Sequence, residues 1–530
     1  MLSSLIFSPI ILGASFFFVP KKYLKPTALG ASLLCFFLSL GLFCFFDPST
    51  AHLQMVQKIP LIPFLGMNYF LGVDGLSFWY VLLTAFLLPL TVLCSWKQNQ
   101  PLYFFFLFLL CGTVMGTFLS FDSLLFFLFF DMTLIPLFFL IYLWGGKDRV
   151  YAAFKFLIYT FFASLFLLAA LVTLMLISKQ SLGYLSASLL DFYKLDLVFV
   201  PGGFLNTQTL LFFCCALAFA VKTPLFPFHT WLPLAHGEAP TAGSVYLAAV
   251  VLKMGTYGWF RLVLPLFPAA SLYYSPVLLF LAVLGLIYAS LVAFAQTDLK
   301  KLVAYSSVAH IAFVPIGIFA FNVYGMFGGF YQTLTHAVSS AGLFLIVGLL
   351  YERTHTREMG NYGGLSKSMP WCAIVFFIIT LSSIALPLTA GFVSEFLTLL
   401  GSYLSGGKWV WFAVAGVVLS AVYMLNVFQK VFLGEEKTNL KSLGDLNRRE
   451  LAILIPIVLL VFLMGVFPNL FFKYSRASLE QLSANYSNYQ LKVYMPDEQK
   501  KEDIELQSDL SEVLFQKDSK RLDFTSGEKF

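Results

Sequence analysis

The sequence predicts an all-α polytopic membrane protein of about fourteen transmembrane helices, with two inverted five-helix repeats and two broken helices. Of its 530 residues, 59% are hydrophobic and only 11% are charged, whereas soluble globular domains carry roughly 25% charged residues. The apolar residues fall in runs of about twenty, the length that crosses a bilayer. Two runs contain proline at membrane depth, where a regular helix cannot continue unbroken.

Apolar runs of this length give fourteen expected spans, each boundary placed to within about four residues. The first lacks a basic segment before it and a clean cleavage site, so we expect a retained helix rather than a signal peptide. The runs are 3–19, 28–46, 76–96, 101–119, 122–143, 153–177, 207–226, 240–264, 274–295, 302–321, 324–350, 370–400, 409–433 and 451–472.

The two predicted breaks lie in the seventh and twelfth helices. AVKTPLFPFHTWLP contains Pro224, Pro227 and Pro233, and LSSIALPLTAGFVSEF contains Pro387 and Gly391. The breaks are five helices apart, which indicates paired repeats, and transporters commonly place ion paths at corresponding broken helices. The predicted parts are helices 1–3 (1–100), the repeat of helices 4–8 (101–265), the repeat of helices 9–13 (266–434), a loop with helix 14 (435–477) and a polar extramembrane tail (478–530).

Loop charges predict the orientation. The positive-inside rule places the loops richer in Lys and Arg in the cytoplasm, and both termini on the outer side. One alternating set of loops carries Lys21, Lys22, Lys25, Lys97, Lys147, Arg149, Lys300, Lys301, Arg353, Arg357, Lys367, Lys437, Lys441, Arg448 and Arg449. The other set carries only Lys58, Lys179, Lys194, Arg261 and Lys408.

No motif for covalent or redox chemistry is visible. The sequence has no Walker loop, no GxGxxG after a strand, no GxSxG and no HExxH. The cysteines show no CxxC or Cys/His metal spacing, so we expect no cofactor and no metal in this chain. The cysteines are Cys35, Cys44, Cys94, Cys111, Cys214, Cys215 and Cys372.

Four charged residues at membrane depth are the strongest functional signal: Asp131, Lys222, Lys253 and Glu395. Each costs at least roughly 2.5–3.5 kcal/mol at mid-bilayer, so each is expected to be paired or hydrated. A buried group whose pKa depends on one charged neighbour can exchange a proton when that neighbour moves. One pair, for example Asp131 with Lys222, could equally be structural. Four charges beside two broken helices favour ion conduction.

Further polar groups accompany these charges. Lys155, near the start of the sixth run, could serve conduction or could extend to the cytoplasmic surface. Four histidines in or beside apolar runs predict a proton relay rather than a metal site, because histidine titrates near neutrality and no third ligand is visible. They are His229, His236, His310 and His336.

The segment VKTPLFPFHTWLPLAHGEAPTAGSVYLAAVVLKMGTYG at 221–258 resembles the signature of subunit M of bacterial NADH–quinone oxidoreductase, the counterpart of mitochondrial NADH dehydrogenase subunit four. Further similar stretches are LGVDGLS (71–77), DMTLIPLFFLIYLWGGKDRVYAAFKFLIYT (131–160), QTDLKKLVAYSSVAH (296–310), HAVSSAGLFLIVGLLYERTHTR (336–357) and LPLTAGFVSEFL (386–397). The resemblance runs in order over about residues 1–472.

The resemblance implies an antiporter-like subunit that moves protons while partner subunits pass electrons from NADH to quinone. It implies that Asp131 pairs with Lys222, that Lys253 forms the central site and that Glu395 leads to the outer side. The histidines then belong to the polar axis between half-channels. In this family the helix 5 carboxylate is usually Glu, and the familiar LPDAH reads LPLAH here, with Leu234 replacing an acid.

The resemblance also implies partners. The expected neighbours are the antiporter-like siblings L and N and other membrane-arm subunits, with flavin, iron–sulfur clusters, NADH and quinone in partner chains. The expected location is a bacterial inner membrane. Two other assignments use the same charges: a subunit of a multisubunit sodium/proton antiporter, and the membrane arm of a related hydrogenase or ferredoxin-linked complex. A purely structural scaffold would leave the four charges without a role.

Overall fold

The computed structural model describes residues 1–530 except 204, 438–439, 441–442 and 495–530, and it is almost wholly helical. Within the described residues, ten helical segments are long and apolar enough to cross a membrane. Five shorter apolar helices accompany them: Leu2–Phe18, Phe78–Cys94, Thr207–Lys222, Pro370–Ser383 and Ala390–Leu404. The predicted class of a polytopic helical membrane protein is confirmed.

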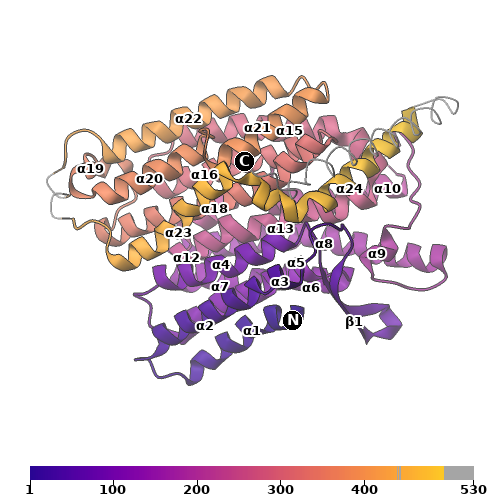
Figure 1. The fold of residues 1–530 in the computed structure, drawn as a ribbon, viewed down its shortest axis with the longest axis horizontal. Helices are drawn as coiled ribbons and strands as arrows, with labels where there is room; N and C mark the ends of the chain where they lie inside the picture. The colour runs from indigo at the N-terminus through magenta and orange to yellow at the C-terminus, as the bar shows by residue number, and fades with distance from the viewer. Residues whose placement is uncertain (204, 438–439, 441–442, 495–530) are drawn as a thin grey trace, which may run out of the picture.

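The first third of the chain contains helices and one hairpin. An antiparallel pair of strands, which the sequence did not predict, follows the first helices and lies at one end of the bundle (Figure 1). The elements are α1 (Leu2–Ser15), α2 (Leu24–Leu40), α3 (Leu42–Phe45), β1 (Gln54–Ile62), β2 (Met67–Val73), α4 (Phe78–Cys94), α5 (Pro101–Leu119), α6 (Ser123–Met132), α7 (Leu134–Trp144) and α8 (Arg149–Leu182).

The middle segment contains one interrupted helix and one helix with two changes of register. The elements are α9 (Leu189–Phe192), α10 (Thr207–Lys222), α11 (Leu232–Glu238), α12 (Thr241–Tyr246), η3 (Leu247–Val251), α13 (Leu252–Gly258), η4 (Trp259–Val263), α14 (Leu264–Leu266) and α15 (Pro268–Phe294). Both η3 and η4 are π-helical turns. Such turns are rare and often occur at functional sites.

The last segment contains the second interrupted helix and a long final helix. The elements are α16 (Leu299–Ile311), α17 (Phe313–Ile318), α18 (Val323–Thr354), α19 (Leu365–Ser368), α20 (Pro370–Ser383), α21 (Ala390–Leu404), α22 (Val410–Phe432), α23 (Arg448–Val466) and α24 (Pro468–Tyr494). The predicted tail therefore begins within α24, and its residues 495–530 lie outside the described part of the chain.

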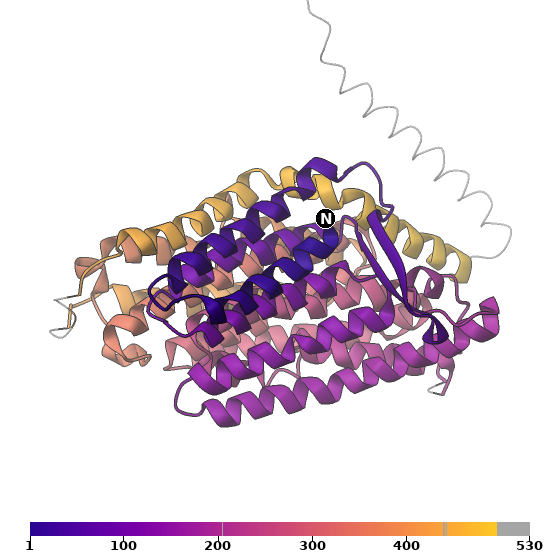
Figure 2. The same ribbon diagram turned by 90° about the horizontal axis from the view of Figure 1, so that it is seen from below.

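Two spans form the core of the bundle. The run from α12 to α14 is buried along its length, and so is α18, in which every residue from Gly325 to Leu350 is buried. The other spans surround them, and α24 runs obliquely across the outside (Figures 1 and 2). Lys253 belongs to the first buried run and His336 to the second. The fold therefore brings a buried lysine and a buried histidine to its centre.

Close packing of α18 against α21 depends on glycine. A Cβ at Gly328 would lie 2.3 Å from the backbone nitrogen of Thr398, and one at Gly401 would lie 2.3 Å from the backbone nitrogen of Gly325. Backbone atoms cannot move aside as a flexible side chain can. These glycines hold α21, with Glu395, directly against the central helix.

We predict that Gly328→Ala lowers stability by about 1–3 kcal/mol, the usual cost of overpacking a filled core. Gly30→Ala on α2 is the matched control, because nothing lies within 4 Å of its added methyl group. The measurement is the thermal unfolding midpoint in mild detergent. Equal midpoints for the two variants would contradict the packing argument.

Candidate functional site

Both predicted breaks are present. Helix α10 ends at Lys222, and α11 begins at Leu232 after a non-helical stretch that contains Pro224. Inside this break, the indole Nε1 of Trp231 donates to the Val221 carbonyl at 3.0 Å and so satisfies one carbonyl at the helix end. Helix α20 ends at Ser383 and α21 begins at Ala390, with Pro387 between them.

Asp131 and Lys222 lie near one another in the bundle but form no direct ion pair within the described residues. The Asp131 carboxylate accepts from Ser164 Oγ at 2.9 Å, and its Oδ1 has no partner. Lys222 Nζ lies 3.5 Å from Thr133 Oγ1 and 4.7 Å from the centre of the Phe130 ring. Each group therefore has only partial compensation for its charge.

Lys253 contacts His336 directly. Its Nζ lies 2.6 Å from His336 Nδ1 and 2.8 Å from the carbonyl oxygen of Ala248. Ala248 belongs to the π-helical turn η3, which ends two residues before Lys253. Lys253 is fully buried, and Nε2 of His336 has no hydrogen-bond partner in the part of the chain that the structure describes. The predicted central lysine and one predicted relay histidine are thus joined.

Glu395 contacts a second histidine. Its Oε1 lies 3.0 Å from His310 Nδ1, and the other ring nitrogen of His310 lies 3.1 Å from the Tyr423 hydroxyl. Glu395 Oε2 has no hydrogen-bond partner within the described ranges. Behind this pair, Ser394 donates to the Gln332 side-chain oxygen at 2.6 Å. This network ties the start of α21 to α16, α18 and α22.

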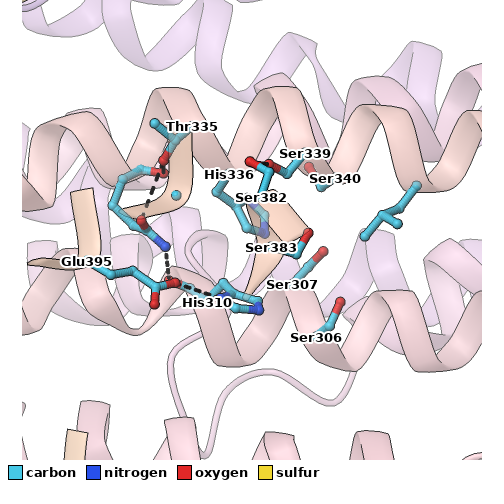
Figure 3. A pocket seen from close by; sticks show the side chains of 13 residues that line it. Ser306, Ser307, His310, Thr335, His336, Ser339, Ser340, Ser382, Ser383 and Glu395 are labelled. Atoms are coloured by element: carbon cyan, nitrogen blue, oxygen red, sulfur yellow. Dashed lines mark hydrogen bonds and ion pairs between the residues drawn. The ribbon is translucent and has the colours of Figure 1, made fainter. Parts of the chain in front are cut away.

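A small polar cavity, here the serine cavity, lies between these two clusters (Figure 3). Its volume is about 20 Å³, enough for a water molecule with several polar partners. Both His336 and Glu395 line it, and each has one unpartnered polar atom. The cavity is also lined by His310 and by the hydroxyl-bearing residues Ser306, Ser307, Thr335, Ser339, Ser340, Ser382 and Ser383.

The other predicted relay residues lie apart from this network. The ring of His236 is stacked on Phe344, with centroids 4.5 Å apart. His229 packs among Phe226 and Tyr288, and neither histidine has a hydrogen-bond partner in the described structure. Lys155 is half-buried on α8. Sequence reasoning grouped all four histidines, whereas only His310 and His336 line the serine cavity.

A second polar cavity, the Glu238 cavity, adjoins the end of α11. It has a volume of about 370 Å³, and its lining includes Lys97, Glu238, Lys300, Glu352 and Arg357. Within it, Arg357 lies 3.6 Å from Glu238 and 3.4 Å from Asp298. Lys300 donates to the Ala239 carbonyl, so a cation caps the negative end of the half-helix. Sequence reasoning counted Lys300 and Arg357 only as loop charges.

Arg261 was wrongly counted among the cations of the loops in the sequence analysis. It lies in η4, is 6% exposed, and its NH2 group contacts both oxygens of Asp74 at 2.6 Å. Nε donates to the Tyr257 hydroxyl at 3.0 Å. Asp74 occurs in the LGVDGLS stretch, but a sequence does not show that it meets an arginine 187 positions away. Within the described ranges, no group of three His, Cys, Asp or Glu side chains could hold a metal ion.

The comparisons with known proteins agree on one family. The sequence profile described as "NADH:quinone oxidoreductase/Mrp antiporter, TM" matches residues 120–422. NADH-quinone oxidoreductase subunit M of Rhodobacter capsulatus is 44% identical over 468 residues, 87% of this chain and 91% of that protein. NADH-ubiquinone oxidoreductase chain 4 of Arabidopsis thaliana is 38% identical over 489 residues, 91% and 96% of the two chains.

Solved structures show the same fold. A chain of respiratory complex I from Thermus thermophilus, determined with bound NADH, superposes with a TM-score of 0.83 at 33% identity, covering 91% of this chain and 99% of that one. A chain of the Mrp complex from Dietzia superposes with a TM-score of 0.78 at 18% identity, covering 91% and 97%. The second likeness concerns the fold alone.

We predict that Asp131→Glu brings a carboxylate oxygen into direct contact with Lys222, because the added methylene group supplies the missing reach. The coupling free energy between positions 131 and 222 should rise by about 1 kcal/mol or more, since Coulomb attraction between partly buried charges increases steeply at contact. Two double-mutant cycles, both measured on thermal stability, test this. Each cycle combines removal of the carboxylate at position 131 with Lys222→Met. One cycle starts from the unaltered protein, and the other starts from the Asp131→Glu variant. Equal coupling in both cycles would show that reach does not limit the pair.

Proposed function

The chain belongs to the NADH:quinone oxidoreductase/Mrp antiporter family of membrane subunits, and we propose that it is the proton-translocating subunit M of a respiratory NADH–quinone oxidoreductase. Identity of 38–44% with subunit M and chain 4 proteins over most of both chains supports this assignment. The observation that carries the mechanism is the contact of buried Lys253 with His336 beside a polar cavity that also receives His310 and Glu395.

In this proposal the chain crosses the membrane fourteen times. The ten long spans count singly, α1 and α4 are two more, and each broken pair, α10 with α11 and α20 with α21, counts as one span. Helices 4–8 and 9–13 form two inverted antiporter-like repeats, in residues 101–265 and 266–434. The loops rich in Lys and Arg face the cytoplasm, so both termini lie on the outer side.

Proton uptake begins at the cytoplasmic end, in the Glu238 cavity. Its lining combines paired carboxylates and cations in a space of about 370 Å³, large enough for several waters at roughly 30 Å³ each. His236 lies on the same half-helix as Glu238, two residues before it. Protons pass from there toward Lys253, and the charge states of Asp131 and Lys222 control the transfer.

The central step moves a proton between Lys253 and His336. Nζ and Nδ1 lie 2.6 Å apart, which is hydrogen-bond distance, so the transfer needs no movement of the helices. Nε2 of His336 then releases a proton into the serine cavity. His310 and Glu395, whose Nδ1 and Oε1 atoms lie 3.0 Å apart, then accept the proton. They pass it outward at the interruption between α20 and α21, which contains Pro387.

The chain needs partners for the redox reaction. In this proposal flavin, iron–sulfur clusters, NADH and quinone bind in other subunits, and siblings L and N adjoin this chain in a bacterial inner membrane. A movement in a neighbouring subunit changes the distance between Asp131 and Lys222, and this change drives the cycle. The sodium/proton antiporter alternative predicts the same charges without redox partners.

Purification in mild detergent separates these assignments. We expect NADH–quinone oxidoreductase activity and bound flavin to accompany this chain. Purification of the chain alone, or only with other antiporter-like chains that catalyse sodium/proton exchange, would contradict the respiratory assignment.

We predict that Asp131→Asn and Glu395→Gln lower NADH-driven proton translocation by about tenfold, the factor that corresponds to ~1.4 kcal/mol in the barrier. Each variant removes the charge that changes during transfer and keeps the shape of the side chain. Acidification of membrane vesicles measures translocation, and flavin content shows that the complex remains assembled. Glu480→Gln is the control, because that carboxylate is exposed on α24 and contacts only Arg476 at 3.9 Å among the charged groups. Full translocation by both variants would refute the assigned path.

A further inference from the structure

A deep apolar groove lies between α2, α4, α18, α23 and α24, away from the polar clusters. Its volume is about 460 Å³ and none of its described lining residues is charged. The floor consists of Leu82, Leu334, Val338 and Met464, each at most 5% exposed. The rim contains Leu463, which is 39% exposed. The groove is therefore a recess in the outer surface of the bundle.

The surroundings of the groove are lipid-facing. On α2, Phe37 is 63% exposed, and on α23, Leu459 is 62% exposed, so both helices present large apolar side chains to the bilayer. Smaller apolar cavities than this stay free of water and take up apolar molecules. A single hydrocarbon chain fits these constraints.

One end of the groove has the character of the membrane–water interface. Trp79 donates from Nε1 to the Phe471 carbonyl at 2.9 Å, and the Tyr474 ring stacks on Phe78 at 4.7 Å. Trp and Tyr are enriched where acyl chains meet headgroups. Lys473 lies at this end, with Nζ 6.0 Å from the centre of the Tyr474 ring and no carboxylate partner among the described residues. A cation thus stands at headgroup level beside an apolar recess.

We propose that this groove binds a phospholipid, with one acyl chain against Leu334 and Val338 and the phosphate at Lys473. Leu334 and Val338 are four residues apart and share a face of α18, whereas His336 lies between them on the opposite face. The acyl chain therefore covers the rear of the helix whose front carries the relay histidine. It keeps water out of the bundle at that point. This inference does not depend on the direction or mechanism of proton transfer.

The first test is lipid content. The protein is purified in mild detergent with the subunits that accompany it, washed a fixed number of times, and its phospholipid is measured as lipid phosphorus per chain. Leu463→Trp fills the rim and should remove about one phospholipid per chain, since the recess has room for about one acyl chain. Leu459→Trp is the matched control on the same helix, outside the groove, and should retain the unaltered content.

The second test addresses the headgroup and the occupant. Lys473→Gln should lose this phospholipid in fewer detergent washes, whereas Lys179→Gln, an exposed lysine outside the groove, should not. A cryo-EM map of the unaltered protein should show a forked chain with its head at Lys473. Equal lipid content in Leu463→Trp and Leu459→Trp would overturn the proposal, and so would density for a protein segment or for detergent only. Equal retention by the two lysine variants would overturn the phosphate contact.

Discussion

The cost of holding the ammonium group of Lys253 away from water governs the centre of the structure. The side chain is fully buried between two spans that are themselves surrounded by other helices. Its compensation comes from two neutral acceptors, the Ala248 carbonyl and a ring nitrogen of His336. The π-helical turn beside Lys253 matters here, because a change of helix register alters which backbone carbonyls are bonded within the helix. One of these two acceptors, the imidazole of His336, can itself take a proton.

Helix interruption and close packing shape the polar network around Glu395. Glu395 reaches His310 because α21 begins anew at Ala390 and packs against α18 through Gly328 and Gly401. An uninterrupted helix would have no free backbone groups at this depth to hold water. The serine cavity lies where the interrupted helix meets α16 and α18, so the breaks and the hydroxyl groups act together.

The lengths of the apolar runs, and the prolines and charged residues inside them, could be identified from the sequence because each depends on a short stretch of chain. They gave the helical class, both breaks and the four charged residues at membrane depth. Contacts between distant segments were not readable. Nothing local to Lys253 indicates that it meets His336, 83 positions away, or that two π-helical turns flank it. Arg261 was misplaced for a related reason: an arginine near the end of an apolar run resembles a loop cation until its partner, Asp74, is seen. The β1–β2 hairpin was missed because its residues lie between two apolar runs and carry no tight-turn signature.

The buried charges of this protein differ in how completely their polar atoms are bonded. Asp74 and Arg261 satisfy one another completely, with two contacts of 2.6 Å, a further bond to Tyr257, and the guanidinium 4.5 Å from the centre of the Phe121 ring. Removing either partner would strand a buried charge, so this pair holds the segment between β2 and α4 against η4 and resists any change of charge state. Among the described residues, Asp131, His336 and Glu395 each keep one polar atom without a partner. A group with spare bonding capacity can exchange a proton at low cost, because the new state finds a contact that the old one left unused. In the function proposed above, this spare bonding capacity is what suits Asp131, His336 and Glu395 to proton transfer.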